Sequence, residues 1–134
     1  MLEGNRYRLQ RLLLEGFGGG DMSVVDEVVA EDFVEHQAEV PRQGPEGLKR
    51  LIHSLRHAFP DLQYTVIQMT QDGDKVWGHF RGKGTHAGPF MGHAPTGKGM
   101  DVEVIDIARF RGGKMFEHWG VPDRLTVLHQ LGLV

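Results

Sequence analysis

The apolar residues of this 134-residue chain follow two different spacings. In most of the first 60 residues they recur every three or four positions, as on the buried face of an amphipathic helix. Further along they alternate with polar residues, as in strands that bury one face. The helical spacing predicts helices over residues 3–17 and 45–59 and a short helix that starts at Ser23. Strands or extended segments are predicted over residues 33–37, 62–71, 75–86 and 101–123.

Turn residues divide the strand-forming region into hairpins. Asp72-Gly73 and Gly112-Gly113 each lie between two alternating segments, which predicts tight turns. A loop rich in glycine and proline, residues 87–99, is predicted to form a flexible lid, and a short helix with Leu125 and Leu128 closes the chain. Helices followed by consecutive strands indicate one α+β domain over residues 1–134, whose glycine-rich sheet can curl around a cavity.

The composition is that of an ordinary soluble domain, with 40% hydrophobic and 25% charged residues. A net charge of -3 gives no indication of nucleic acid or a membrane surface as a partner. The first residues alternate charge with leucine and lack the apolar core of a signal peptide, so the expected location is cytoplasmic. The absence of cysteine excludes disulfides, thiol catalysis and cysteine-ligated metals.

Two partial motifs do not indicate a nucleotide or metal site. The segment from Gly92 to Gly99 approaches a phosphate-binding loop, but it lacks the final hydroxyl and precedes a predicted strand instead of a helix. His53 and His57 have metal-ligand spacing on the helix 45–59, yet they lie opposite its apolar face and no carboxylate shares their spacing. We therefore expect no metal ion and no nucleotide cofactor.

Two aspartates are candidates for chemistry, and each has a structural alternative. Asp106 lies between Ile105 and Ile107, where a carboxyl group is costly to bury unless it is paired, protonated or used as an acid or base. By strand alternation it lies on the opposite face from Arg109. Asp123 precedes the terminal helix, so it is placed equally well to cap that helix.

His36 is a third candidate, because a histidine titrates near neutral pH and suits proton transfer. The alternative is a hydrogen-bonded histidine in a strand. The large apolar side chains of the predicted sheet and its loop could line an apolar cavity, and they suit an ordinary hydrophobic core equally well. They are Trp77, Phe90, Met91, Phe116 and Trp119.

Two stretches resemble a known family. They are GTHAGPFMGHAPTG, at Gly84–Gly97, and EHWGVPD, at Glu117–Asp123. Together with the helix 45–59 they are similar to the SnoaL-like polyketide cyclases, also called ester cyclases, of the NTF2-like superfamily. The resemblance implies a cone-shaped α+β barrel, with a strongly bent antiparallel sheet, N-terminal helices and a short C-terminal helix around a deep pocket. It also implies a homodimer formed through the sheet.

The resemblance further implies an aldol-type ring closure of a hydrophobic polyketide ester by acid–base catalysis, without metal or organic cofactor. By position Asp123 corresponds to the general acid/base of such cyclases. A histidine assists, with His36, His79 and His118 as candidates, and we take His36 as the assisting group. His79, Asp106 and His118 then join Trp77, Phe90, Met91 and Trp119 as expected pocket residues. The alternatives are a non-catalytic module that binds a small hydrophobic ligand, and an isomerase, dehydratase or epoxide hydrolase.

Overall fold

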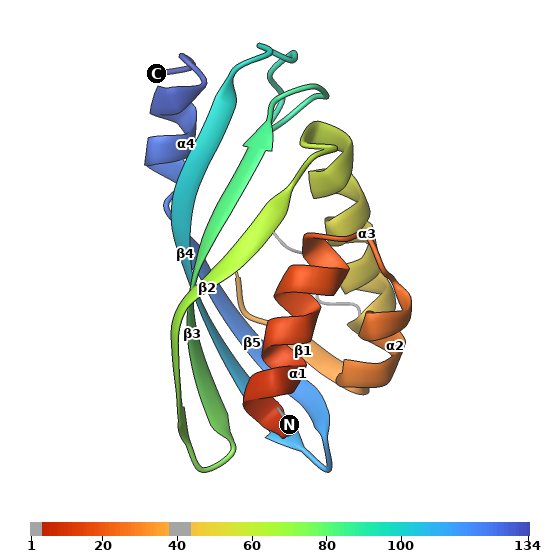
Figure 1. Cartoon of the computed structure of the whole chain (residues 1–134). Coiled ribbons are helices and arrows are strands. Elements are labelled where there is room, and N and C mark those ends of the chain that lie inside the picture. Colours follow the sequence, from red (N-terminus) through yellow and green to blue (C-terminus); the bar gives the residue numbers. More distant parts are fainter. Residues whose placement is uncertain (1–3, 38–43) are drawn as a thin grey trace.

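The computed structural model describes residues 4–37 and 44–134, which form one bent sheet with helices packed against it (Figure 1). The sheet has five strands in the order β1-β5-β4-β3-β2. The strands are β1 (Val29–Glu35), β2 (Gln63–Asp72), β3 (Lys75–Thr85), β4 (Gly99–Arg111) and β5 (Lys114–Pro122). The pairs from β2 to β5 are antiparallel, as expected, whereas β1 runs parallel to β5. The α+β architecture predicted from the order of elements is confirmed.

Helices account for most of the remaining described residues. They are α1 (Asn5–Arg11), the π-helix η1 (Leu12–Phe17), α2 (Ser23–Val28), α3 (Gly44–Ala58) and α4 (Arg124–Gln130). The predicted helix over residues 3–17 thus has two parts, of which the second is wound more widely. The described part of the chain contains no helix with the length and apolar character needed to cross a membrane.

Both predicted hairpins form, and their turns follow from the strand register. Arg111 pairs with Lys114, which leaves Gly112 and Gly113 as a two-residue turn with φ of 58° and 79°. Positive φ at both central residues is the geometry that matches the twist of the flanking strands. The other turn lies one residue later than predicted, because Asp72 is still paired with Lys75.

The inner face of the sheet is covered by α1, α2 and α3, which lie together on one side (Figure 1). Alternation along β3 buries Val76 and Phe80 against these helices and turns Trp77 to the outer face. Irregular register in β1–β5, β2–β3 and β4–β5 accompanies the bend of the sheet. At the end remote from the hairpin turns, α4 lies beside β4 and packs through Val127 and Leu131.

Candidate active site

Three buried ionisable side chains meet on the inner face of the sheet. Glu35 ends β1, Asp106 is in the middle of β4 and His118 is on β5. Their exposed fractions are 1%, 4% and 7%. His118 Nδ1 lies 2.8 Å from both carboxylate oxygens of Glu35, and His118 Nε2 lies 2.7 Å from Asp106 Oδ1. The imidazole is therefore held between two carboxylates inside the protein.

This arrangement sets the protonation state of His118. Each ring nitrogen faces a carboxylate, and both nitrogens are donors only in the imidazolium form. Burial by itself lowers the pKa of His118, but the hydrogen bonds and charges of Asp106 and Glu35 outweigh it and raise the pKa from 6.5 to about 10. The ring therefore carries its proton at neutral pH, where it compensates the charge of the buried carboxylates.

Glu35 reaches His118 because β1 and β5 are parallel neighbours in which these two residues are in register. The Glu35 carboxylate also accepts a hydrogen bond of 3.1 Å from the backbone N–H of Gln37. Glu35 was not among the site residues predicted from the sequence. The signal was its spacing from Phe33, because residues two apart in a strand share a face and Phe33 is a typical core residue.

Asp106 is the member of the cluster that has spare hydrogen-bonding capacity. Its Oδ1 is bonded to His118, whereas its buried Oδ2 has no hydrogen-bond partner in the described ranges. A buried carboxylate oxygen without a partner is costly and is commonly kept for function. Asp106 is thus a buried acid that is paired, with His118, as its position between two isoleucines required. Its Oδ2 remains available to accept a hydrogen bond or a proton.

All three side chains line a cavity between the inner face of the sheet and the helices. The cavity volume is about 120 Å³, whereas one water molecule needs about 10–15 Å³ by the same measure, so the space suits a small ligand. Its walls are mainly apolar and include Leu13, Phe17, Leu55, Phe59, Phe90 and Val127. An apolar cavity with a few polar groups at one place is the usual form of a small-molecule site.

Tyr64 on β2 is another residue that lines the cavity. Burial and, to a smaller extent, the charge of Asp106 raise the pKa of Tyr64 above its usual range. The phenol therefore keeps its proton at neutral pH, and it can act as a hydrogen-bond donor. Its ring meets Phe17 edge to face, with centroids 6.2 Å apart.

Gly120 gives Gln37 access to the same region. Gly120 is the register partner of Asp106 on β5, and a β-carbon added there would lie 2.3 Å from Gln37 Oε1 and 3.1 Å from His118 Cε1. No real side chain could occupy that position without moving the Gln37 amide. The missing side chain at residue 120 thus leaves room for Gln37, which also lines the cavity.

The structure divides the predicted pocket residues between the two faces of the sheet. Phe90, Asp106 and His118 line the cavity. Trp77 and His79 do not, because they alternate with the inward residues of β3 and lie on the outer face. Trp119 is turned away by the same alternation along β5 and stacks on His36 outside the cavity. Met91 is exposed at a turn of the loop between β3 and β4.

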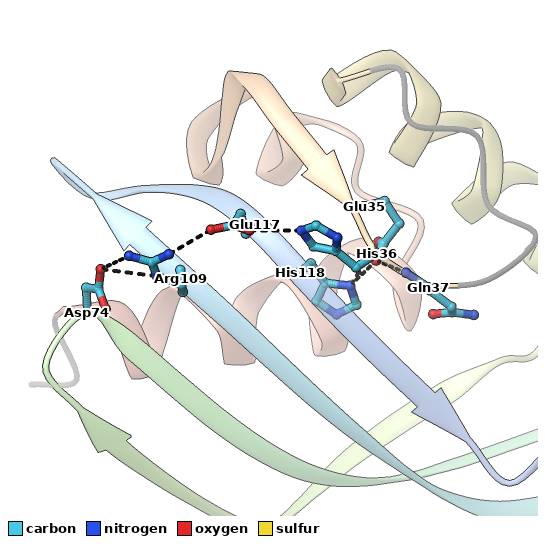
Figure 2. Close-up of polar contacts among 7 residues, drawn as sticks. All are labelled: Glu35, His36, Gln37, Asp74, Arg109, Glu117 and His118. Atoms are coloured by element: carbon cyan, nitrogen blue, oxygen red, sulfur yellow. Dashed lines mark hydrogen bonds and ion pairs between the residues drawn. The ribbon is translucent and has the colours of Figure 1, made fainter.

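The two predicted catalytic residues also lie outside the cavity lining. Asp123 is the N-cap of α4: its Oδ1 accepts from Thr126 N at 3.2 Å and its Oδ2 from the Thr126 hydroxyl at 2.7 Å. This is the structural alternative noted for the sequence. His36 follows Glu35 and therefore points to the opposite face, where its Nε2 lies 2.9 Å from Glu117 Oε2. Figure 2 shows His36 and His118 with their different partners.

A bent sheet closed by helices over an apolar cavity, with two carboxylic acids and a histidine in its lining, is an architecture of the NTF2-like type. The chain belongs to the SnoaL-like polyketide cyclase family, whose model matches residues 7–131. The family and the NTF2-like fold suggested by the sequence motifs are thereby confirmed.

Individual relatives support the same assignment. The chain is 28% identical to the aklanonic acid methyl ester cyclase DnrD of Streptomyces peucetius over 130 residues, which cover 92% of this chain and 88% of DnrD. It is 25% identical to the nogalonic acid methyl ester cyclase of Streptomyces nogalater over 126 residues, covering 90% and 92% of the two chains. The structure of TsrD from Streptomyces laurentii superimposes with a TM-score of 0.87 at 27% identity, covering 98% of this chain and all of TsrD.

Proposed function

We propose that this protein is a cofactor-independent cyclase that closes a ring in a hydrophobic polyketide ester by an intramolecular aldol reaction. The observation that carries the proposal is Asp106 Oδ2, a buried carboxylate oxygen without a partner among the described residues, beside His118 in an apolar cavity. A base next to a fixed positive charge is what the removal of a proton alpha to a carbonyl requires. The relatives that are named as methyl ester cyclases support this choice of reaction.

In the proposed reaction, Asp106 Oδ2 removes a proton from a carbon next to a carbonyl group. The C–H electron pair forms the enolate, whose oxygen takes up negative charge. The enolate carbon then attacks a second carbonyl carbon of the same molecule, so that one C–C bond forms and the attacked oxygen becomes an alkoxide. Asp106 returns its proton to the alkoxide, which gives the alcohol and restores the carboxylate.

The surrounding side chains supply the stabilisation that this sequence of steps needs. The His118 imidazolium places a positive charge beside Asp106, and the Tyr64 phenol offers a proton donor inside the cavity. In an apolar, water-poor site such groups stabilise a developing enolate more strongly than they would in water. Glu35 holds the imidazolium in place from its other side.

This proposal replaces Asp123 by Asp106 as the general acid/base. Asp123 already uses both carboxylate oxygens on Thr126, and Asp123 is not among the residues that line the cavity. Asp106 has the burial, the histidine partner and the free oxygen that the chemistry needs. In this proposal His36 does not contact the substrate either.

The test is a turnover assay with aklanonic acid methyl ester and nogalonic acid methyl ester as substrates. The wild-type protein is expected to cyclise at least one of them, and Asp106→Asn is expected to lose about 10²–10⁴-fold in kcat. Asp123→Asn is the matched control and should keep its rate. If Asp123→Asn loses activity and Asp106→Asn does not, the assignment of the base is refuted. If the wild-type protein cyclises neither ester, cyclisation of these two compounds is refuted.

A second candidate function is the binding of a small hydrophobic ligand without chemistry. The observation in its favour is that Asp123, the residue at the expected catalytic position, caps α4. Both functions use the same cavity, so ligand binding by itself does not separate them. A protein that binds the esters and returns them unchanged would support the binding module.

We also propose that two copies of the chain associate through the outer face of the sheet. Trp77 and Val121 are 45% and 65% exposed there, beside Ile105 and Ile107, which alternation places on the same face. Large apolar side chains grouped on one face of a sheet are typical of an interaction surface. A cytoplasmic location stays a prediction, which fractionation of cells that produce the protein would test.

A further inference from the structure

A second set of charged side chains crosses the outer face of the sheet (Figure 2). Arg109 on β4 donates through Nε and Nη2 to Asp74 Oδ2, at 3.3 and 3.1 Å, and through Nη1 to Glu117 Oε1 at 2.9 Å. Glu117 Oε2 in turn lies 2.9 Å from His36 Nε2. We call Asp74, Arg109, Glu117 and His36 the outer chain. It runs from the β2–β3 turn across β4 and β5 to the end of β1.

His36 is the point at which the outer chain meets β1. Its backbone N–H donates to the carbonyl oxygen of His118 at 2.8 Å. Its ring contacts Glu117 and stacks on Trp119, with ring centroids 4.6 Å apart and planes 11° apart. One residue is thus fixed to β5 through its backbone, a charged hydrogen bond and an aromatic contact.

The strand β1 needs such an anchor. Its ladder with β5 is registered at Val29, Val34 and Glu35, with an irregularity between the first two. The Glu35 carboxylate that binds His118 therefore stands at the last registered position of a short ladder. Because neighbouring residues of a strand point to opposite faces, His36 can be held from outside while Glu35 and Gln37 face the cavity.

A glutamate contacts a histidine on each side of the sheet, and the segments that supply the two residues are exchanged between the sides. Glu35 on β1 contacts His118 on β5 inside the protein, and His36, the residue directly after β1, contacts Glu117 on β5 outside it. A displacement of residues 35 and 36 would break both contacts, since the two residues are adjacent in the chain. Each pair therefore restrains the other.

We propose that the outer chain is a positioning device, in which His36 fixes the end of β1 so that the Glu35 carboxylate stays on His118. This inference concerns the site of the proposed function and assigns His36 to its geometry instead of its chemistry. Surface ion pairs contribute little stability one at a time, and a linked network contributes more. The expected effect of losing the outer chain is local. The Glu35 side chain would no longer be held against His118, so His118 would keep only the contact with Asp106.

The test is the pKa of His118, measured by NMR titration of histidine-labelled protein without substrate. His36→Phe keeps an aromatic ring for Trp119 and removes the contact with Glu117. The charged and titratable groups that face His118 are Glu35 and Asp106, with Tyr64 beside Asp106. When Glu35 loosens, the pKa of His118 should fall by about 1 unit, the size expected for one adjacent opposite charge.

The sign of the change separates positioning from simple electrostatics. Phenylalanine at position 36 carries no charge that could repel a proton from His118, so a fall in the pKa of His118 requires that Glu35 has moved away. His36→Gln retains a donor for Glu117 and should restore the wild-type value. The matched control is His79→Phe, which breaks the His79–Glu103 contact on the same face, between β3 and β4, and should leave His118 unchanged.

A pKa of His118 in His36→Phe that equals or exceeds the wild-type value would overturn the proposal. If His36→Phe does not fold, Arg109→Met interrupts the outer chain one step further from β1, and the same fall in pKa is expected. Because the titration uses no substrate, it is independent of the proposed cyclase activity. A fall in the pKa of His118 in a protein that turns over neither ester would support the outer chain and refute the cyclisation of these esters.

Discussion

Glu35 and His118 are register partners in the parallel pair of β1 and β5, and their side chains meet at 2.8 Å on the inner face of the sheet. With Asp106 on the other side of the ring, this contact makes His118 an imidazolium at neutral pH. Because the cluster lies in an apolar cavity, we expect its charge state to affect both the stability of the protein and the chemistry that we propose.

The stability of the protein should fall as the pH rises from about 6.5 to about 10. The pKa of His118 is near 6.5 in the unfolded chain and about 10 in the folded protein. The folded state therefore binds more protons over this interval, and the stabilisation is complete below its lower end and lost toward its upper end. The urea midpoint at successive pH values measures the effect.

The control for this titration is Glu35→Gln, which removes one carboxylate charge and keeps the shape of the side chain. It lowers the pKa of His118 in the folded state, so the loss of stability should end at a lower pH. A wild-type urea midpoint that stays constant between pH 6.5 and pH 10 would contradict the buried imidazolium.

Replacement of Asp123 by alanine should cost stability by about 1 kcal/mol, the usual effect of losing a helix N-cap. The variant loses both hydrogen bonds to Thr126 at the start of α4. Thermal or urea unfolding measures the change. Asp123→Asn keeps a good N-cap residue and should stay close to wild type, so equal losses in both variants would argue against capping as the role of Asp123.

Tyr64→Phe should lower kcat by about 10²-fold, the usual cost of removing one donor that stabilises an oxyanion. KM should change little, because the ring and its edge-to-face contact with Phe17 remain. Steady-state kinetics with whichever ester is turned over separates the two constants. A variant with normal kcat would remove Tyr64 from the proposed mechanism, and an unchanged melting temperature would show that the fold is intact.

Gly120→Ala should fold normally but weaken the function of the cavity. The added β-carbon would lie 2.3 Å from Gln37 Oε1, at the end of a flexible side chain that can move away. The melting temperature should therefore change by only a few degrees, whereas KM for the ester should rise. If displacement of Gln37 is the cause, Gly120→Ala should have no further effect in a Gln37→Ala background.

Trp77→Glu should convert the proposed dimer into a monomer. The substitution places a charge among the apolar side chains of the outer face, where it would have to be buried on association. Sedimentation velocity measures the mass. Met91→Glu is the control, because Met91 is similarly exposed, at 48%, but lies in the loop between β3 and β4. A wild-type protein that is monomeric at high concentration would refute the dimer.

Local patterns in the sequence determined many of the structural features of this protein. The spacing of apolar residues predicts the helices and strands, Gly112-Gly113 predicts its turn, and alternation correctly separates Asp106 from Arg109. The capping alternative for Asp123 also follows from the residues beside it. These features depend on contacts between residues close in the chain, so a single sequence contains the information for them.

The tertiary structure alone decided which residues form the site. Glu35 and His118 are 83 positions apart, and their contact depends on the parallel register of β1 and β5, which no local pattern specifies. Alternation shows that Trp77 and Phe80 lie on opposite faces, but only the packing of the helices shows which face encloses a cavity. The physical reason is that long-range register and layer packing are fixed by the burial of the whole core, and this places Asp106 and His118 inside the protein.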